Sequence, residues 1–126
     1  MATAAELQVK DKIFIGGEWV APSGAEPIEV VNPTTEEVIG TIPGCSPEDV
    51  DRAVAAARKA FDEGPWPRMT PLERSRIMHK IATLLRDRLP EIAVVETTNC
   101  GKIVVESRGD VTASATCFEY YAGLAT

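Results

Sequence analysis

The sequence has 126 residues, of which 44% are hydrophobic and 25% charged, so its length and composition fit one domain with a modest core rather than a disordered chain. Its formal net charge of −6 argues against a general nucleic-acid binder, because neutralising phosphates requires a surplus of Lys and Arg. The sequence has neither a basic start followed by an apolar core nor an apolar run of about 20 residues, so we expect a soluble, cytoplasmic protein without a membrane span.

The first predicted element is a short hairpin, with strands at residues 12–15 and 18–20 joined by Gly16 and Gly17. A glycine pair between apolar and aromatic runs favours a two-residue turn, because primed turns need positive φ and glycine adopts it without a Cβ clash. The alternative interpretation of this stretch, FIGGEW, is a phosphate-binding glycine loop. Neither GxGxxG nor GxxxxGK follows and no helix begins directly after the glycines, so we interpret the pair as a turn.

A second hairpin is predicted from residues 27–31 and 38–43, which are rich in β-branched residues. The stretch NPTTEE lies between them. Its Asn32-Pro33 pair favours a turn, because proline fixes φ and pushes the preceding residue out of the helical region. Two hairpins therefore occupy the first third of the chain.

Two helices with the same start signal follow. The stretches SPED, residues 46–49, and TPLE, residues 70–73, each supply an N-cap, a first-turn proline and an acid three residues after the cap. Gly64, Pro65 and Pro67 break the first helix, and Pro90 interrupts the second, which residues 91–98 continue briefly. The apolar residues at helical spacing are Val50, Ala53, Val54, Ala57 and Phe61 in the first, and Ile77, Ile81, Leu84 and Leu85, predicted as a buried stripe, in the second.

A last helix is predicted from about residue 102 to 125, after a stop at Gly101, which can take the left-handed conformation. Gly109 and the many alanines of this helix suggest close packing against a neighbour. No linker is long enough to divide the chain, so one unit is expected, with four strands followed by four helices. The stripe of the last helix is Val104, Val111, Phe118 and Ala125, with Ser107, Ser114 and Tyr121 between them.

Cysteine and histidine give little support for catalysis. The three cysteines, Cys45, Cys100 and Cys117, have wide, irregular spacing, which suits free thiols in a reducing compartment. Cys117 is interpreted as a small packing residue, whereas Cys45 precedes a helix N-terminus, where a thiolate could be favoured. The single histidine, His79, lies about 200° around its helix from Ile77 and is expected to be exposed.

A basic stretch between residues 68 and 88 carries six Lys and Arg against two acidic residues. A nucleic-acid patch would need interleaved aromatic residues, so a solvated helix face is the preferred interpretation. The HExxH, GxSxG, CxxC and Walker patterns are missing from the sequence. The residues alone therefore predict a scaffold without a catalytic centre.

Five stretches in this order, FIGGEW, EVVNPTTEEVIGTIP, SPEDVDRAVAAARKAF, GPWPRMTPLER and CFEYYAGLA, resemble the N-terminal portion of the aldehyde dehydrogenase family, collinearly from about Ile13 to Ala125. The resemblance implies an oligomeric enzyme with an α/β fold that oxidises an aldehyde to a carboxylic acid with NAD or NADP. Residues 1–126 would form the N-terminal, incomplete part of its cofactor-binding domain, an α+β fragment of two β-hairpins and about four α-helices.

The family's nucleophilic cysteine, general-base glutamate, oxyanion-hole asparagine and cofactor-contacting residues have no matching positions here. The resemblance therefore implies no catalytic and no cofactor-binding residue in this chain, which alone is expected to be inactive and to bind no NAD or NADP. Its expected partners are the remainder of the enzyme or homologous subunits, with no nucleic acid and no membrane. The alternative is a non-catalytic interaction module that pairs with a full-length relative, with an exposed apolar patch including Val104, Val111 and Phe118.

The resemblance also implies a structural site for a monovalent cation. By the family's pattern, Val30 and Val31 would offer backbone carbonyls and Asp110 a carboxylate, the oxygen ligands that hard cations prefer. At least one further ligand of the cation would lie beyond Thr126. The alternative interpretation of Asp110 is a charged side chain on the solvated face of the helix. The chain departs from the family around NCGKI, where Asn99 replaces an acid and Ile103 replaces a proline.

Overall fold

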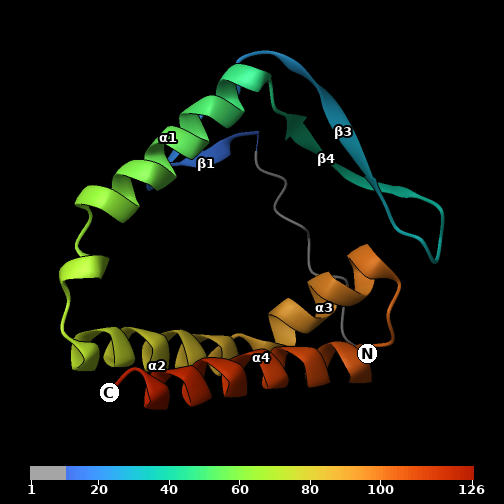
Figure 1. Cartoon of the computed structure of the whole chain (residues 1–126). Helices are drawn as coiled ribbons and strands as arrows, with labels where there is room; N and C mark the ends of the chain where they lie inside the picture. The colour runs from blue at the N-terminus through green and yellow to red at the C-terminus, as the bar shows by residue number, and fades with distance from the viewer. Residues whose placement is uncertain (1–10) are drawn as a thin grey trace. The chain divides into compact units, whose positions relative to one another are not determined.

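The structure, a computed structural model, describes residues 11–126. Four strands are followed by four α-helices, as the sequence predicted, with a short 3-10 helix η1 between the first two. These residues divide into two compact units, 11–31 with 37–68 and 32–36 with 69–126, whereas one unit was expected. The bounds are β1 Ile13–Ile15, β2 Glu18–Val20, β3 Ala25–Val31, β4 Val38–Gly44, α1 Pro47–Glu63, η1 Trp66–Arg68, α2 Pro71–Asp87, α3 Leu89–Cys100 and α4 Val104–Leu124 (Figure 1).

The first unit begins with the predicted glycine turn. Strands β1 and β2 pair antiparallel, with Phe14 opposite Trp19 and the two ring centroids 5.2 Å apart. Gly16 and Gly17 have φ of 64° and 92°, the positive values that a primed two-residue turn requires. The interpretation of FIGGEW as a turn is therefore confirmed.

Strands β3 and β4 form the second antiparallel hairpin, which is longer than predicted. Ile28 pairs with Ile42, and Val30 pairs with Gly40. The register shifts between residues 25 and 28, where Pro27 lies, which agrees with the confinement of proline to edges and bulges because it lacks an N–H donor. The sequence pattern missed residues 25–26 because nothing β-branched marks them.

Helix α1 follows β4 with the predicted start. Ser46 caps it by accepting from the Asp49 N–H, and the Asp49 carboxylate accepts in return from the Ser46 N–H at 3.1 Å. Gly44 and Asp49 are the buried positions among the described residues of this unit. The apolar residues of α1 therefore stay exposed, Phe61 among them at 69%.

In the second unit, α2 and α4 lie side by side (Figure 1). The buried apolar residues are small, which lets helices approach closely, and they are Ala82, Ala93, Val111, Ala115 and Ala122. Within the predicted stripe of α4, Val111 is buried and Val104 and Phe118 are half-buried. The expectation that these three residues form an exposed apolar patch is thus wrong, because α2 and α3 pack on this helix.

Two details of the helix predictions also differ from the structure. Leu84, predicted in the buried stripe of α2, is 50% exposed, because the buried line runs through Ser75 and Ala82 and Leu84 lies about 200° further around the helix. Gly109 was expected at a close helix contact, yet a Cβ built on it would meet nothing within 4 Å. Ala115 and Ala122 of α4, rather than its glycines Gly109 and Gly123, make the close approach.

The junction between α3 and α4 is well defined. Gly101 has φ of 72°, the left-handed conformation predicted for it, and its N–H donates to the Thr97 carbonyl at 2.9 Å. The turn residue Pro33 lies so close that its Cγ would be 2.8 Å from a Cβ at Gly101. The Thr97 and Ser107 hydroxyls meet at 2.8 Å, which satisfies the fully buried Ser107.

Over residues 11–126, none of the helices combines the length and apolarity that a bilayer crossing requires.

Candidate functional site

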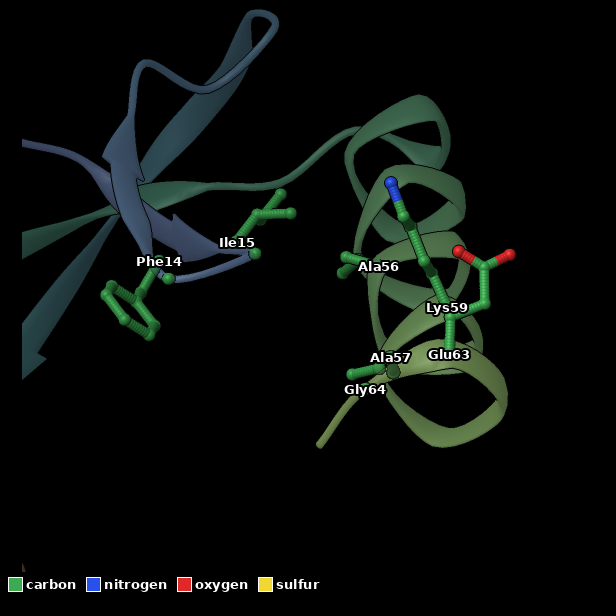
Figure 2. Close-up of a pocket in the computed structure, with 11 residues that line it drawn as sticks. Phe14, Ile15, Ala56, Ala57, Lys59, Glu63 and Gly64 are labelled. Carbon is green, nitrogen blue, oxygen red and sulfur yellow. The ribbon is translucent and has the colours of Figure 1, made fainter. Parts of the chain in front are cut away.

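A hollow in the first unit lies between the β1–β2 hairpin and α1, and we call it the hairpin groove. It has a volume of about 750 Å³. Figure 2 shows Ile15 on the hairpin and Ala56 and Ala57 on α1 at its two sides. Small alanine side chains line much of the α1 wall, so the surface of the groove is mainly apolar. Its lining residues are Phe14, Ile15, Gly16, Gly17, Ala53, Ala56, Ala57, Lys59, Ala60, Glu63 and Gly64.

A second hollow of about 390 Å³ shares part of this wall and extends toward the start of α1, where Cys45 and Asp49 line it together with Val50 and Val54. No histidine lines either hollow, and His79 belongs to the other unit. Cys45 therefore has no histidine beside it to act as a base, and the carboxylate that lines the same hollow is that of Asp49. The two hollows, lined mainly by apolar residues, are suited to contact with apolar groups.

Beside the second hollow, Asp49 holds the start of α1 to the preceding loop. It is 1% exposed and accepts hydrogen bonds from the Ser23 N–H at 2.9 Å and the Ser46 N–H, and it is ion-paired with Arg52. The Ser23 and Ser46 hydroxyls meet at 2.6 Å above it. The Ser23 N–H and the Arg52 guanidinium hold the pKa of this carboxyl far below its usual range, so it stays ionised although it is buried.

The residues predicted for the cation site lie in different units. Val30 and Val31 are consecutive in β3, and Asp110 is on the exposed side of α4. The Asp110 Oδ2 is ion-paired with the Lys102 ammonium, and this carboxylate raises the pKa of Lys102. Among residues 11–126, His, Cys, Asp and Glu side chains form no group of three that could hold a metal ion.

The predictions for single thiols and the histidine have mixed outcomes. Cys45, Cys100 and Cys117 are all free and exposed. The interpretation of Cys117 as a packing residue is wrong, because the inward positions of α4 next to it are taken by Ala115 and Ala122. His79 is exposed, as predicted from its position on α2.

Sequence reasoning missed two polar contacts and the groove. The Ser23–Asp49 hydrogen bond joins residues 26 positions apart, so no local pattern indicates it. The Lys102–Asp110 pair crosses a helix start and therefore falls outside the three- and four-residue spacing that predicts helical ion pairs. The glycine turn indicated a hairpin, but its packing beside α1 had no signal in the sequence.

Comparison with known protein families matches residues 19–126 to the Aldehyde dehydrogenase family. Betaine aldehyde dehydrogenase of Bacillus subtilis is 42% identical over 113 residues, which are 90% of this chain and 23% of that protein. Aminoaldehyde dehydrogenase 2 of Zea mays is 47% identical over 116 residues, again 90% of this chain and 23% of the relative. The chain thus spans about a quarter of the length of the curated relatives it matches.

Solved structures give the same result. The NAD-dependent aldehyde dehydrogenase of Sinorhizobium meliloti aligns with a TM-score of 0.83 at 43% identity, over 89% of this chain and 22% of that structure. Betaine aldehyde dehydrogenase of Staphylococcus aureus, solved in complex with NAD+, aligns with a TM-score of 0.87 at 33% identity, over 93% of this chain and 23% of that structure.

Proposed function

From the finding that the chain belongs to the aldehyde dehydrogenase family and matches the N-terminal part of its fold, we propose a role for it in a larger enzyme. It serves as the N-terminal part of the cofactor-binding domain of an enzyme that oxidises an aldehyde to a carboxylic acid with NAD or NADP. The single observation that supports this role is the close structural alignment over nearly the whole chain, combined with coverage of about a quarter of each relative. In this role the chain acts as a scaffold, and the reacting groups come from the remainder of the enzyme or from homologous subunits.

The proposal includes inactivity of the chain alone. Covalent oxidation of an aldehyde needs an activated thiolate, and no histidine lines the hollow beside Cys45, where the Asp49 carboxylate is already engaged by three hydrogen-bond donors. Purified chain mixed with betaine aldehyde and NAD or NADP should form no NADH or NADPH above the rate without protein, measured at 340 nm. Aldehyde-dependent formation of reduced cofactor by the chain alone would refute the inactivity.

We also propose that Val30, Val31 and Asp110 supply oxygen ligands to a structural monovalent cation. Two carbonyls and a carboxylate are the hard donors such an ion prefers, and the Lys102 pair uses Oδ2 of Asp110, which leaves Oδ1 as the donor to the ion. Replacing choline chloride by potassium chloride at equal ionic strength should raise the melting temperature of the wild-type chain more than that of Asp110→Asn. An equal response of the two proteins would argue against the site.

A second candidate function is a non-catalytic interaction module that pairs with a full-length relative. The observation that favours it is the exposure of large apolar side chains on the first unit, such as Phe14 at 58% and Phe61 at 69%. Under this alternative, immobilised chain should retain a full-length relative in a pull-down without changing its activity. Under the leading proposal, binding of the chain to the remainder of the enzyme should instead be required for assembly of an active site.

A further inference from the structure

Within residues 11–31 and 37–68, the unit that contains α1, much of the apolar stripe of this helix is exposed. Val50, Val54, Ala57 and Phe61 follow one another at intervals of four, three and four residues, so they lie along one face of the helix. Val50, Val54 and Phe61 are 53%, 61% and 69% exposed. This set, which we call the α1 stripe, resembles the core-facing side of an amphipathic helix, yet its large side chains are more than half exposed.

The β1–β2 hairpin extends this surface on one side. Ile13, Phe14 and Ile15 line the hollow of about 390 Å³ together with residues of the α1 stripe, so strand and helix form its two walls. Phe14 is 58% exposed at this wall. Arg58 lies over the Phe61 ring, 4.4 Å from its centroid, and its guanidinium also binds Asp62, which forms a charged edge to an otherwise apolar surface.

An apolar centre with a charged edge is the usual organisation of a protein–protein contact surface. Among the described residues of this unit, the buried positions are a glycine and an aspartate, so little apolar burial stabilises it. Covering the α1 stripe and the hairpin wall would add apolar burial. The relatives suggest what covers it, because they are about four times as long as the part that matches this chain.

We propose that the α1 stripe and the adjoining wall of the hairpin form a docking surface for an apolar segment from the three quarters of an aldehyde dehydrogenase polypeptide that this chain does not match. The inference rests on the proposed function and adds a surface and a partner to it. Docking buries Val54 and Phe61 and excludes water from the hollow beside Phe14. The partner segment presents apolar side chains, because Asp49 is the one charged residue among the described residues that line the hollow, and the others are apolar apart from Cys45.

Binding can be measured with a defined probe, the betaine aldehyde dehydrogenase polypeptide of Bacillus subtilis from which its matched 113-residue segment has been removed. The probe is refolded with fluorescently labelled full chain, and complex formation is followed by anisotropy. The probe's own missing segment is the positive control. The test variant is Val54→Asp with Phe61→Asp. The control is Ala55→Asp, which adds a carboxylate to the same helix at an exposed position about 100° around the helix from Val54 and outside the α1 stripe.

The double variant should bind the probe at least about tenfold more weakly than the wild-type chain, whereas Ala55→Asp should bind as the wild type does. Equal helix content by circular dichroism shows that the variants are folded. Equal binding by the double variant and the wild type would overturn the inference, and so would failure of the wild-type chain to bind a probe that binds its own segment. Self-association of the chain that the double variant abolishes, without probe binding, would assign the surface to a second copy and also overturn it.

Enzyme activity separates this inference from the proposed function. If the complex forms through the α1 stripe but produces no NADH from betaine aldehyde, the docking surface stands and the proposed function fails. If the complex produces NADH and the double variant produces it equally well, the proposed function stands and the docking surface fails.

Discussion

Asp49 is a charged residue in a buried position, and its three donors explain how it is tolerated. The Ser23 and Ser46 N–H groups and the Arg52 guanidinium all point to its carboxylate. Asn at this position would keep the shape, but its amide nitrogen cannot accept, so it would lose either the Arg52 ion pair or the two backbone hydrogen bonds that share Oδ2. Asp49 thus links a loop to a helix start by charge-assisted hydrogen bonds.

We expect Asp49→Asn to lower the melting temperature of the chain by roughly 5 °C, because the loss of buried charge-assisted hydrogen bonds shifts small domains by this order. Thermal unfolding followed by circular dichroism measures the change. Asp51→Asn is the matched control, since Asp51 is exposed on the same turn of α1 and should change the melting temperature little. Equal effects of the two substitutions would contradict the structural role of Asp49.

The same contacts predict how stability depends on pH. The Ser23 N–H is the main cause that lowers the pKa of Asp49, with Arg52 next. In this pH range the folded state then binds fewer protons than the unfolded state. The contribution of Asp49 to the free energy of unfolding is therefore fully present above the unfolded pKa of about 4, and it is lost as pH falls toward the lower folded pKa. Urea unfolding between pH 7 and pH 3 should show stability falling below about pH 4, and less steeply in Asp49→Asn. Parallel profiles for the two proteins would show that another carboxyl controls the acid transition.

At the level of elements, the α3–α4 junction depends on one glycine. Gly101 ends α3 in the left-handed conformation and lies against Pro33, so a side chain there meets both backbone strain and a steric contact. We expect Gly101→Ala to destabilise the chain by about 1–3 kcal/mol, the usual cost of strained backbone positions. Chemical denaturation with urea measures the difference.

Gly109→Ala is the opposite case and the control for this prediction. Gly109 lies inside α4, and an added Cβ would meet nothing within 4 Å. We therefore expect stabilisation by up to about 1 kcal/mol, because alanine is the better helix former. A destabilising Gly109→Ala in the isolated chain would show a contact at this face that the structure lacks.

The success of the sequence predictions depends on how local their physical cause is. The glycine turn, both capping boxes and the stop at Gly101 were predicted correctly, because a few neighbouring residues determine each of them. The exposure of Leu84 and Cys117 was predicted wrongly, because which side of a helix is buried depends on distant partners. The cation ligands Val30, Val31 and Asp110 remain a prediction.

At the level of the whole molecule, burial is unevenly distributed between the two units. The buried apolar residues of the described chain all lie on α2, α3 and α4, whereas those of α1 and the hairpins are exposed or half-buried. Apolar burial is the main stabilising contribution to folding, so the two units should differ in local stability. The family match explains the imbalance, because a part that covers about a quarter of its relatives need not contain a balanced core of its own.

Hydrogen exchange tests this difference directly. Amides in the middle of α2 and α4 should exchange slowly, through unfolding of the helical unit, because Ala82, Val111 and Ala115 bury these helices against each other. Amides of α1 and of the β1–β2 hairpin should exchange at least about tenfold faster under the same conditions, since a difference in opening free energy of 1.4 kcal/mol already has this effect. Mass spectrometry of peptides from each element measures the rates. Protection of α1 equal to that of α4 would show that α1 gains burial in solution, and addition of the truncated Bacillus subtilis probe should produce such protection if the α1 stripe is where that polypeptide docks.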